Sequence, residues 1–158
     1  MSENPLAPKK PERPRDALGR PLPWGSPSEL ELEDYDRFSP EENHRLAMDA
    51  FDAGRYFPAH EAWEAAWRQL RGSEDEEFFK GLAQLGAGYT HWRRGNPHGA
   101  RVLIERALSR LRRYPSPYRG LETRALVAML EEHARRFRDA ELRGEREFPL
   151  DPPRLPRG

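Results

Sequence analysis

A histidine and a glutamate stand four residues apart in the segment His60-Glu61-Ala62-Trp63-Glu64. On an α-helix, residues i and i+4 lie on one face with their side chains about 5–6 Å apart. His60 and Glu64 can therefore reach one divalent cation together, or act as a base and the group that orients it. A buried pair of this kind can also tie two helices together by hydrogen bonds. Four interpretations stay open: metal or small-ligand binding, acid–base chemistry, a structural contact, and a weak surface pair without a role.

Two side chains do not complete a metal site, and the next helix along the chain supplies further candidates. If that helix runs antiparallel to the first about a turn at Gly72, Gln84 lies level with the pair and His91 lies further out. We expect Gln84 and His91 to complete the set of groups around a metal or a small polar ligand. Glu61 lies one residue from His60 and is expected to point about 100° away, toward solvent.

The wall of this groove is predicted to consist of two aromatic and two very small residues. Helical spacing brings Trp63 and Trp67 beside the polar pair, and Gly81 and Gly88 follow on the facing helix. Glycine lowers helix propensity, and close approach by bulky side chains is a reason to accept that cost. The prediction is a polar cluster in a groove walled by Trp63, Trp67, Gly81 and Gly88, which is typical of small binding sites.

Capping residues and prolines at helix starts divide the middle of the chain into helices. Ser39-Pro40-Glu41-Glu42 is a capping box that opens the first, and Pro58 is expected to start the second. A second capping box at 73–76 opens a third helix that lasts to about residue 94, Asn96-Pro97 opens the fourth, and a fifth is expected over about 121–138. No segment alternates with period two, so no sheet is expected. Short connections force neighbouring helices to pack antiparallel. The predicted fold class is all-α, a compact array of about five antiparallel helices.

The distribution of proline marks the ends of this array. Eight of the 16 prolines fall in residues 1–40 and four in 149–158. We predict an extended Pro-rich and acidic arm over 1–38, a helical domain over 39–140 and an extended Pro-rich tail over 141–158. The arm is either a disordered tail or a strap held on the domain by its large apolar side chains, which are Leu22, Trp24, Leu30, Tyr35 and Phe38.

Composition excludes several classes of protein. Cysteine is absent, which excludes disulfides, thiolate nucleophiles and cysteine-ligated metal sites. No apolar run approaches the ~20 residues of a membrane span, so we expect no membrane partner and a cytoplasmic location. The zinc-protease motif HExxH is absent, because Glu64 stands where its second histidine would be.

The charges balance, with 27 basic and 27 acidic residues, although arginine outnumbers lysine 24 to 3. A stripe of arginines on the predicted fourth helix could track phosphates; it consists of Arg101, Arg106, Arg110, Arg112 and Arg113. Because the net charge is zero and residues 29–42 are acidic, we expect the stripe to dock that acidic segment or a protein partner. Nucleic acid is not the expected partner.

Three stretches of sequence, 51–68, 79–85 and 89–96, resemble in order a small bacterial and archaeal helical family. That family is known as domain of unknown function 309 and is marked by the motif HxxxExxW. Its motif residues fall here on His60, Glu64 and Trp67, and the resemblance covers about residues 41–115. Metal binding has been suggested for the family from this motif, so the resemblance implies a divalent metal ion as cofactor. It also adds Gln84 and His91 to the candidate set.

The sequence thus predicts a small helical protein with a site on His60 and Glu64 for a divalent metal or a small polar ligand. If the protein is an enzyme, metal-assisted hydrolysis is the expected class of reaction. The alternative is a non-enzymatic helical adaptor, in which the His60–Glu64 pair is structural and the charged faces bind a protein, a second copy of the chain or, less readily, nucleic acid.

Overall fold

The computed structural model describes residues 13–28, 30, 32–147 and 149–158, and the chain divides into two compact units, Met1–Glu31 and Leu32–Gly158. In the first unit a tight turn is organised by Asp16, whose carboxylate accepts the N–H groups of Leu18 and Arg20 at 2.9 and 2.8 Å. Glu29 and Glu31 of the predicted acidic segment lie outside the described residues.

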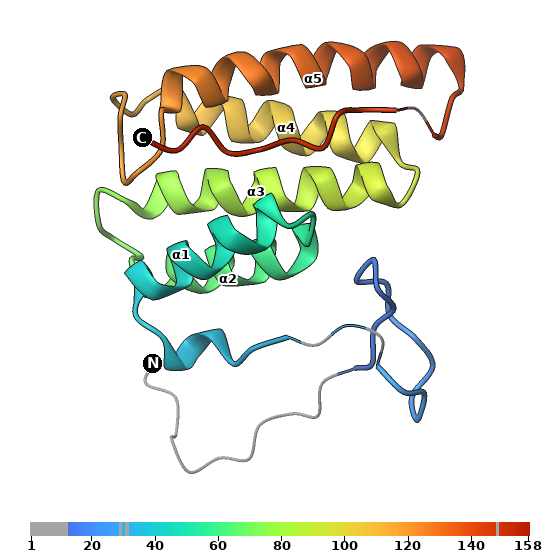
Figure 1. The fold of residues 1–158 in the computed structure, drawn as a ribbon, viewed down its shortest axis with the longest axis horizontal. Coiled ribbons are helices and arrows are strands. Elements are labelled where there is room, and N and C mark those ends of the chain that lie inside the picture. Colours follow the sequence, from blue (N-terminus) through green and yellow to red (C-terminus); the bar gives the residue numbers. More distant parts are fainter. Residues whose placement is uncertain (1–12, 29, 31, 148) are drawn as a thin grey trace. The chain divides into compact units, whose positions relative to one another are not determined.

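The second unit consists of helices, and the described part of the chain contains no strand longer than an isolated bridge. A 3₁₀ turn, η1 (Tyr35–Arg37), precedes five α-helices: α1 (Pro40–Asp52), α2 (Tyr56–Gln69), α3 (Glu76–Arg93), α4 (Pro97–Leu111) and α5 (Thr123–Arg143). Each helix packs against the next one in chain order (Figure 1). The all-α prediction is confirmed. No described helix combines the length and the apolar character required to cross a membrane.

Two of the predicted helix starts have the expected capping geometry. The Ser39 hydroxyl accepts the Glu42 N–H and the Glu42 carboxylate accepts the Ser39 N–H, both at 3.1 Å. The Asn96 side chain accepts the Gly99 N–H at 3.0 Å and caps α4. These bonds satisfy amides that have no partner within the helix.

The starts of α2 and α3 differ from the prediction. α2 begins at Tyr56, so Pro58 lies inside its first turn, where proline costs no helical hydrogen bond. α3 begins only at Glu76, without a side-chain cap. The Ser73 hydroxyl accepts the Asp75 N–H instead, and the Glu76 carboxylate accepts the Gly72 N–H at 3.2 Å. The second predicted capping box therefore shapes the turn before α3.

The core is rich in aromatic side chains from the first three helices. The largest of those that are fully buried there are Phe51, Trp63, Phe78, Phe79 and Tyr89. Their rings meet edge to face, for example Phe51 with Tyr89 at 5.3 Å between centroids, an arrangement that favours aromatic pairs beyond their burial.

The C-terminal segment after α5 runs back along the helices and packs on them (Figure 1). Leu150 and Leu155 are buried in the core. The Leu155 N–H donates to Asp52 of α1 at 2.9 Å, and the Glu122 N–H at the start of α5 donates to the Pro156 carbonyl at 2.7 Å. The segment thereby ties the first helix to the beginning of the last one.

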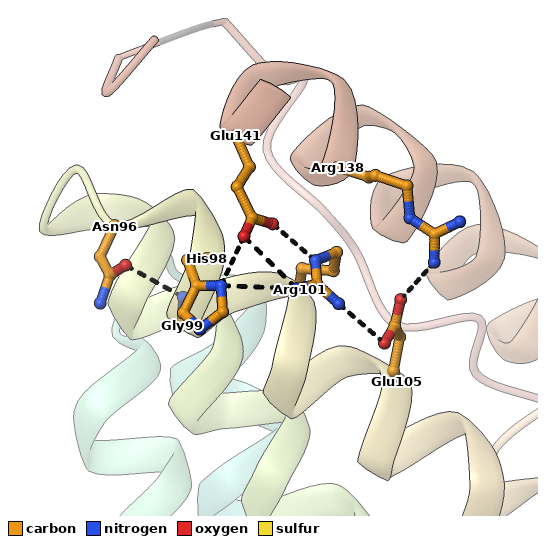
Figure 2. A network of polar contacts seen from close by, with 7 residues as sticks. All are labelled: Asn96, His98, Gly99, Arg101, Glu105, Arg138 and Glu141. Atoms are coloured by element: carbon orange, nitrogen blue, oxygen red, sulfur yellow. Dashed lines mark hydrogen bonds and ion pairs between the residues drawn. The ribbon is translucent and has the colours of Figure 1, made fainter. Parts of the chain in front are cut away.

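Carboxylates of the helical unit pair with several arginines of the predicted stripe. Arg101 binds Glu141 of α5 at 2.6 Å and Glu105 at 3.1 Å, in the network of Figure 2. Arg110 binds Glu77 at 2.7 Å and Arg112 binds Glu131 at 3.2 Å.

The acidic segment does not pair with this stripe in the described part of the chain. Its ion pairs run instead from Asp36 to Arg68 at 3.5 Å and from Glu41 to Arg119 at 3.6 Å. This differs from the expectation that the stripe docks the acidic segment.

Candidate functional site

One turn of α2 gathers three groups that can ligate a metal. His60, Glu61 and Glu64 each offer one ligand atom, and these atoms all lie within 4.8 Å of one another. The expectation that Glu61 points to solvent is therefore wrong. Its backbone position is about 100° from that of His60, but the three-bond glutamate side chain is long enough to return its carboxylate to the pair.

His60 has a defined distribution of hydrogen on its ring. Its Nδ1 lies 2.8 Å from the main-chain oxygen of Ala83 on α3. A carbonyl oxygen only accepts hydrogen bonds, so Nδ1 carries a proton. In the neutral ring, Nε2 then has a lone pair, and this atom lies 3.1 Å from Oε2 of Glu64. Two acceptors at that distance repel unless a cation lies between them, either a proton on Nε2 or a metal ion.

The electrostatics of the pair agree with this geometry. Burial acts to lower the pKa of His60, but the hydrogen bonds to Glu64 and to the Ala83 carbonyl outweigh it and raise that pKa. The hydrogen bond from His60 lowers the pKa of Glu64, against the effect of burial and with the help of Arg68. The site thus favours a positive charge beside an ionised carboxylate.

Close contact between α2 and α3 holds His60 in place. A Cβ atom added to Gly86 would lie 3.0 Å from both the Cα and the N of His60. Glycine allows this approach without a shift of either helix, and the approach brings the Ala83 carbonyl within hydrogen-bond distance of Nδ1. Gly86 is a positioning residue that the sequence analysis missed.

The predicted companions on α3 face the other way. Gln84 accepts a hydrogen bond from Arg110 of α4 at 3.3 Å. A Cβ on Gly81 would meet Arg110 and Leu111, and one on Gly88 would meet Ile104, all on α4. These three residues therefore lie at the α3–α4 contact, and the prediction that Gly81 and Gly88 face the tryptophans is wrong. The predicted position of Gln84 along α3, level with His60, is nearly right, but the residues of α3 that face α2 there are Ala83 and Gly86.

The two tryptophans have different positions. Trp63 is fully buried and donates its indole N–H to Nδ1 of His44 at 3.0 Å, so it belongs to the core and not to a groove wall. Trp67 is partly buried against the core, and the Lys80 ammonium lies over its ring, 5.1 Å from the centroid. Of the two, only Trp67 reaches the partly exposed surface of α2.

His91, near the end of α3, does not belong to the group of three ligand atoms. Burial lowers its pKa, and the charges of Arg94 and of His60 lower it further. The Nδ1 of His91 lies 3.1 Å from the side-chain nitrogen, Nδ2, of Asn96.

Glu64 also links the site to the segment that precedes α1. Its second oxygen accepts from Arg68 at 3.1 Å, and Arg68 reaches Asp36 of η1 at 3.5 Å. The carbonyl of Tyr35 in η1 accepts from the Asn43 side chain at 2.8 Å. Asp36 and Arg68 were not predicted as neighbours of the site, because no spacing in the sequence relates residues from separate elements.

The part of the chain that carries this site is similar to proteins of one family. Residues 44–103, which carry α2 and α3, match the model described as "Domain of unknown function (DUF309)". An uncharacterised protein of Aquifex aeolicus (strain VF5) is 27% identical over 86 residues, 54% of this chain. The aligned region spans about a quarter (26%) of that relative. The comparison with solved structures finds no match. The part of the chain that carries His60, Glu61 and Glu64 is thus similar to the DUF309 family.

Proposed function

We propose that the turn of α2 around His60 binds a divalent metal ion through His60 Nε2 and the carboxylates of Glu61 and Glu64. The observation that carries the proposal is the hydrogen bond from His60 Nδ1 to the Ala83 carbonyl at 2.8 Å, which leaves the Nε2 lone pair beside Glu64. Histidines that ligate metals usually donate their other N–H to a carbonyl or carboxylate in this way.

The donor set suits a divalent cation in charge and in spacing. Two carboxylates and one neutral imidazole carry two negative charges, and mixed nitrogen and oxygen ligands are typical of zinc, manganese and ferrous iron. Metal–ligand bonds of about 2.0–2.2 Å place neighbouring ligand atoms about 3 Å apart. The 3.1 Å between Nε2 and Oε2 already has that value. Glu61 needs only a side-chain adjustment to join them.

The site is open on one side, which bears on its chemistry. All three ligands come from one helix, and the side chains of His60 and Glu64 are 23% and 30% exposed. A metal held there keeps coordination positions for water or a small polar ligand. Such an ion can activate a bound water, so metal-assisted hydrolysis is the reaction class that we propose if the protein is an enzyme.

A structural role for the pair is the second candidate, and a specific observation favours it. His60, Glu64, Arg68 and Asp36 form a continuous series of ion pairs that links α2 to η1. If this series only stabilises the fold, His60→Ala leaves the Ala83 carbonyl without its partner and costs about 1–3 kcal/mol. In that case neither the wild type nor His60→Ala would bind metal, and the protein would be a helical adaptor.

Elemental analysis tests the proposal. Untagged wild-type protein, the double variant His60→Ala/Glu64→Ala and the control His98→Ala are equilibrated with zinc, manganese or ferrous iron and then separated from free metal. The control removes an exposed histidine that also pairs with a glutamate, Glu141. We expect about one metal per chain in the wild type and the control, and none in a double variant that is still folded. No metal in the wild type with any of the three ions contradicts the proposal.

A further inference from the structure

Asn96 fixes the proton of His91. The Asn96 side-chain oxygen accepts the Gly99 N–H at 3.0 Å, a cap visible in Figure 2. Because the oxygen is committed to the cap, the amide group of Asn96 directs its NH₂ toward His91 Nδ1, 3.1 Å away. An NH₂ group only donates, so Nδ1 accepts and the neutral ring carries its proton on Nε2. His91 and His60 therefore have opposite tautomers.

The packing of α4 shows on which side of the ring this proton lies. A Cβ on Gly99 would meet Nδ1 and Cγ of His91 at 2.8 and 2.9 Å. That edge of the ring therefore faces the start of α4. Nε2 lies across the ring from this contact, so its N–H is directed away from α4. In the neutral rings, Nε2 of His60 has a lone pair that can bind the proposed metal, whereas Nε2 of His91 has an N–H that can donate a hydrogen bond.

A guanidinium lies at the same end of the site. The ring of Phe57, one turn before His60, stands 6.0 Å from the imidazole of His60 between centroids. The guanidinium carbon of Arg94 lies over the same Phe57 ring, 5.8 Å from its centroid. Phe57 thus contacts both His60 and Arg94. Arg94 is the residue that caps α3, where its N–H donates to the His91 carbonyl, and its charge lowers the pKa of His91.

Donors and positive charge beside a metal match one class of ligand. We propose that the metal site takes an oxyanion, a phosphate or a carboxylate group, as its exchangeable ligand, and that His91 Nε2–H and the Arg94 guanidinium bind its outer oxygens; this inference rests on the metal site proposed above. Arginine pairs well with both groups, because its planar fork fits two oxygens. Glu61 and Glu64 repel an anion until a cation neutralises them, so oxyanion binding requires the metal.

Cobalt provides a probe of this arrangement, because the visible spectrum of Co²⁺ responds to exchange of its ligands. The wild-type protein is loaded with Co²⁺ and titrated separately with inorganic phosphate, acetate and neutral acetamide. The same titrations are made on His91→Phe and Arg94→Gln. The control is His98→Gln, whose histidine pairs with Glu141 of α5. Co²⁺ affinity without added anion is measured for every variant.

We expect phosphate or acetate to change the Co²⁺ spectrum of the wild type, and acetamide to leave it unchanged. The stronger of the two anions identifies the oxyanion group. His91→Phe and Arg94→Gln should each weaken anion binding by about tenfold or more, as for the loss of a hydrogen bond to a charged group. Co²⁺ affinity without anion should stay within about threefold, and His98→Gln should behave as the wild type.

Each failure has a separate signature. If the protein binds Co²⁺ but neither anion, or binds anions equally well in His91→Phe and Arg94→Gln, the oxyanion inference is wrong and the metal site stands. If the wild type takes up no Co²⁺, the proposed metal site itself is wrong, and the inference falls with it.

Discussion

Gly86→Ala is the substitution whose effect the structure defines most sharply. The added Cβ would lie 3.0 Å from the Cα and N of His60, whereas ordinary contacts begin at 3.4 Å, so the deficit is at least 3.4 − 3.0 = 0.4 Å. Both atoms are helix backbone, so relief requires α2 and α3 to move apart as units. Overpacking of this kind costs about 1–3 kcal/mol.

The gain in helix propensity offsets part of that cost. Alanine is favoured over glycine inside a helix by about 1 kcal/mol. With the middle of that cost, about 2 kcal/mol, we expect Gly86→Ala to lower the free energy of unfolding by about 1 kcal/mol in total, which lowers Tm by roughly 2–4 °C in a chain of this length. The separation of the helices also lengthens the hydrogen bond from His60 to Ala83, so the affinity for metal should fall with the stability.

Urea unfolding followed by circular dichroism measures this change, with Gly81→Ala as the matched control. A Cβ on Gly81 meets only side-chain atoms, those of Arg110 and Leu111, and all of them at 3.2 Å. The control should lose less stability than Gly86→Ala. The reasoning is refuted if Gly86→Ala is as stable as the wild type, or if the order of the two variants is reversed.

Three further predictions concern other parts of the helical unit. Leu155→Ala, in the C-terminal segment, should lower the free energy of unfolding in urea by about 2–4 kcal/mol, because Leu155 is buried. The control Leu142→Ala should change it by less than about 0.5 kcal/mol, because Leu142 is 78% exposed. Equal losses would show that the segment does not pack as described. Burial lowers the pKa of His44, which accepts from Trp63 and donates to the Arg119 carbonyl. The unfolded chain therefore takes up this proton first, so the contribution of His44 to the free energy of unfolding should be constant above pH about 6.5 and decrease as pH falls toward the folded pKa. His44→Gln should remove this acid-side dependence. Hydrogen bonds from Arg101 and His98 lower the pKa of Glu141 to about 2. The Tm difference between wild type and Glu141→Gln should thus persist through mildly acidic pH and vanish only near pH 2. Its disappearance by pH 4 would contradict the network of Figure 2.

The sequence predicts the helices well because their ends carry local chemical signals. The capping box at Ser39 and the Asn96-Pro97 pair act within four residues, so their effect can be read without knowledge of the tertiary structure. The pair His60 and Glu64 was predicted for the same reason, since i,i+4 neighbours meet in any helix.

The faces of α3 could not be predicted in the same way. This helix packs against α2 on one side and α4 on the other, so small residues occur on both sides. Gly81 and Gly88 serve one contact and Gly86 the other. Nothing local distinguishes the two sets, and Gln84 was therefore assigned to the wrong side.

The C-terminal segment shows a further limit. Its packing depends on a few side chains, Leu150, Pro153 and Leu155, which have no helical or alternating spacing. Its partners Asp52 and Glu122 are distant in sequence. Long-range contacts made by an irregular segment leave no periodic pattern to detect.

Nitrogen NMR of His60 examines the proposed metal ligand itself, because it observes the two ring nitrogens separately. Long-range ¹H–¹⁵N spectra are recorded on the wild type without metal and with one equivalent of Zn²⁺, and His60→Gln assigns the signals. We predict that Nδ1 keeps its proton in both samples, held by the Ala83 carbonyl, while Nε2 loses its proton and shifts on addition of Zn²⁺. An Nε2 that stays protonated and unshifted with Zn²⁺ present would contradict a metal site at His60.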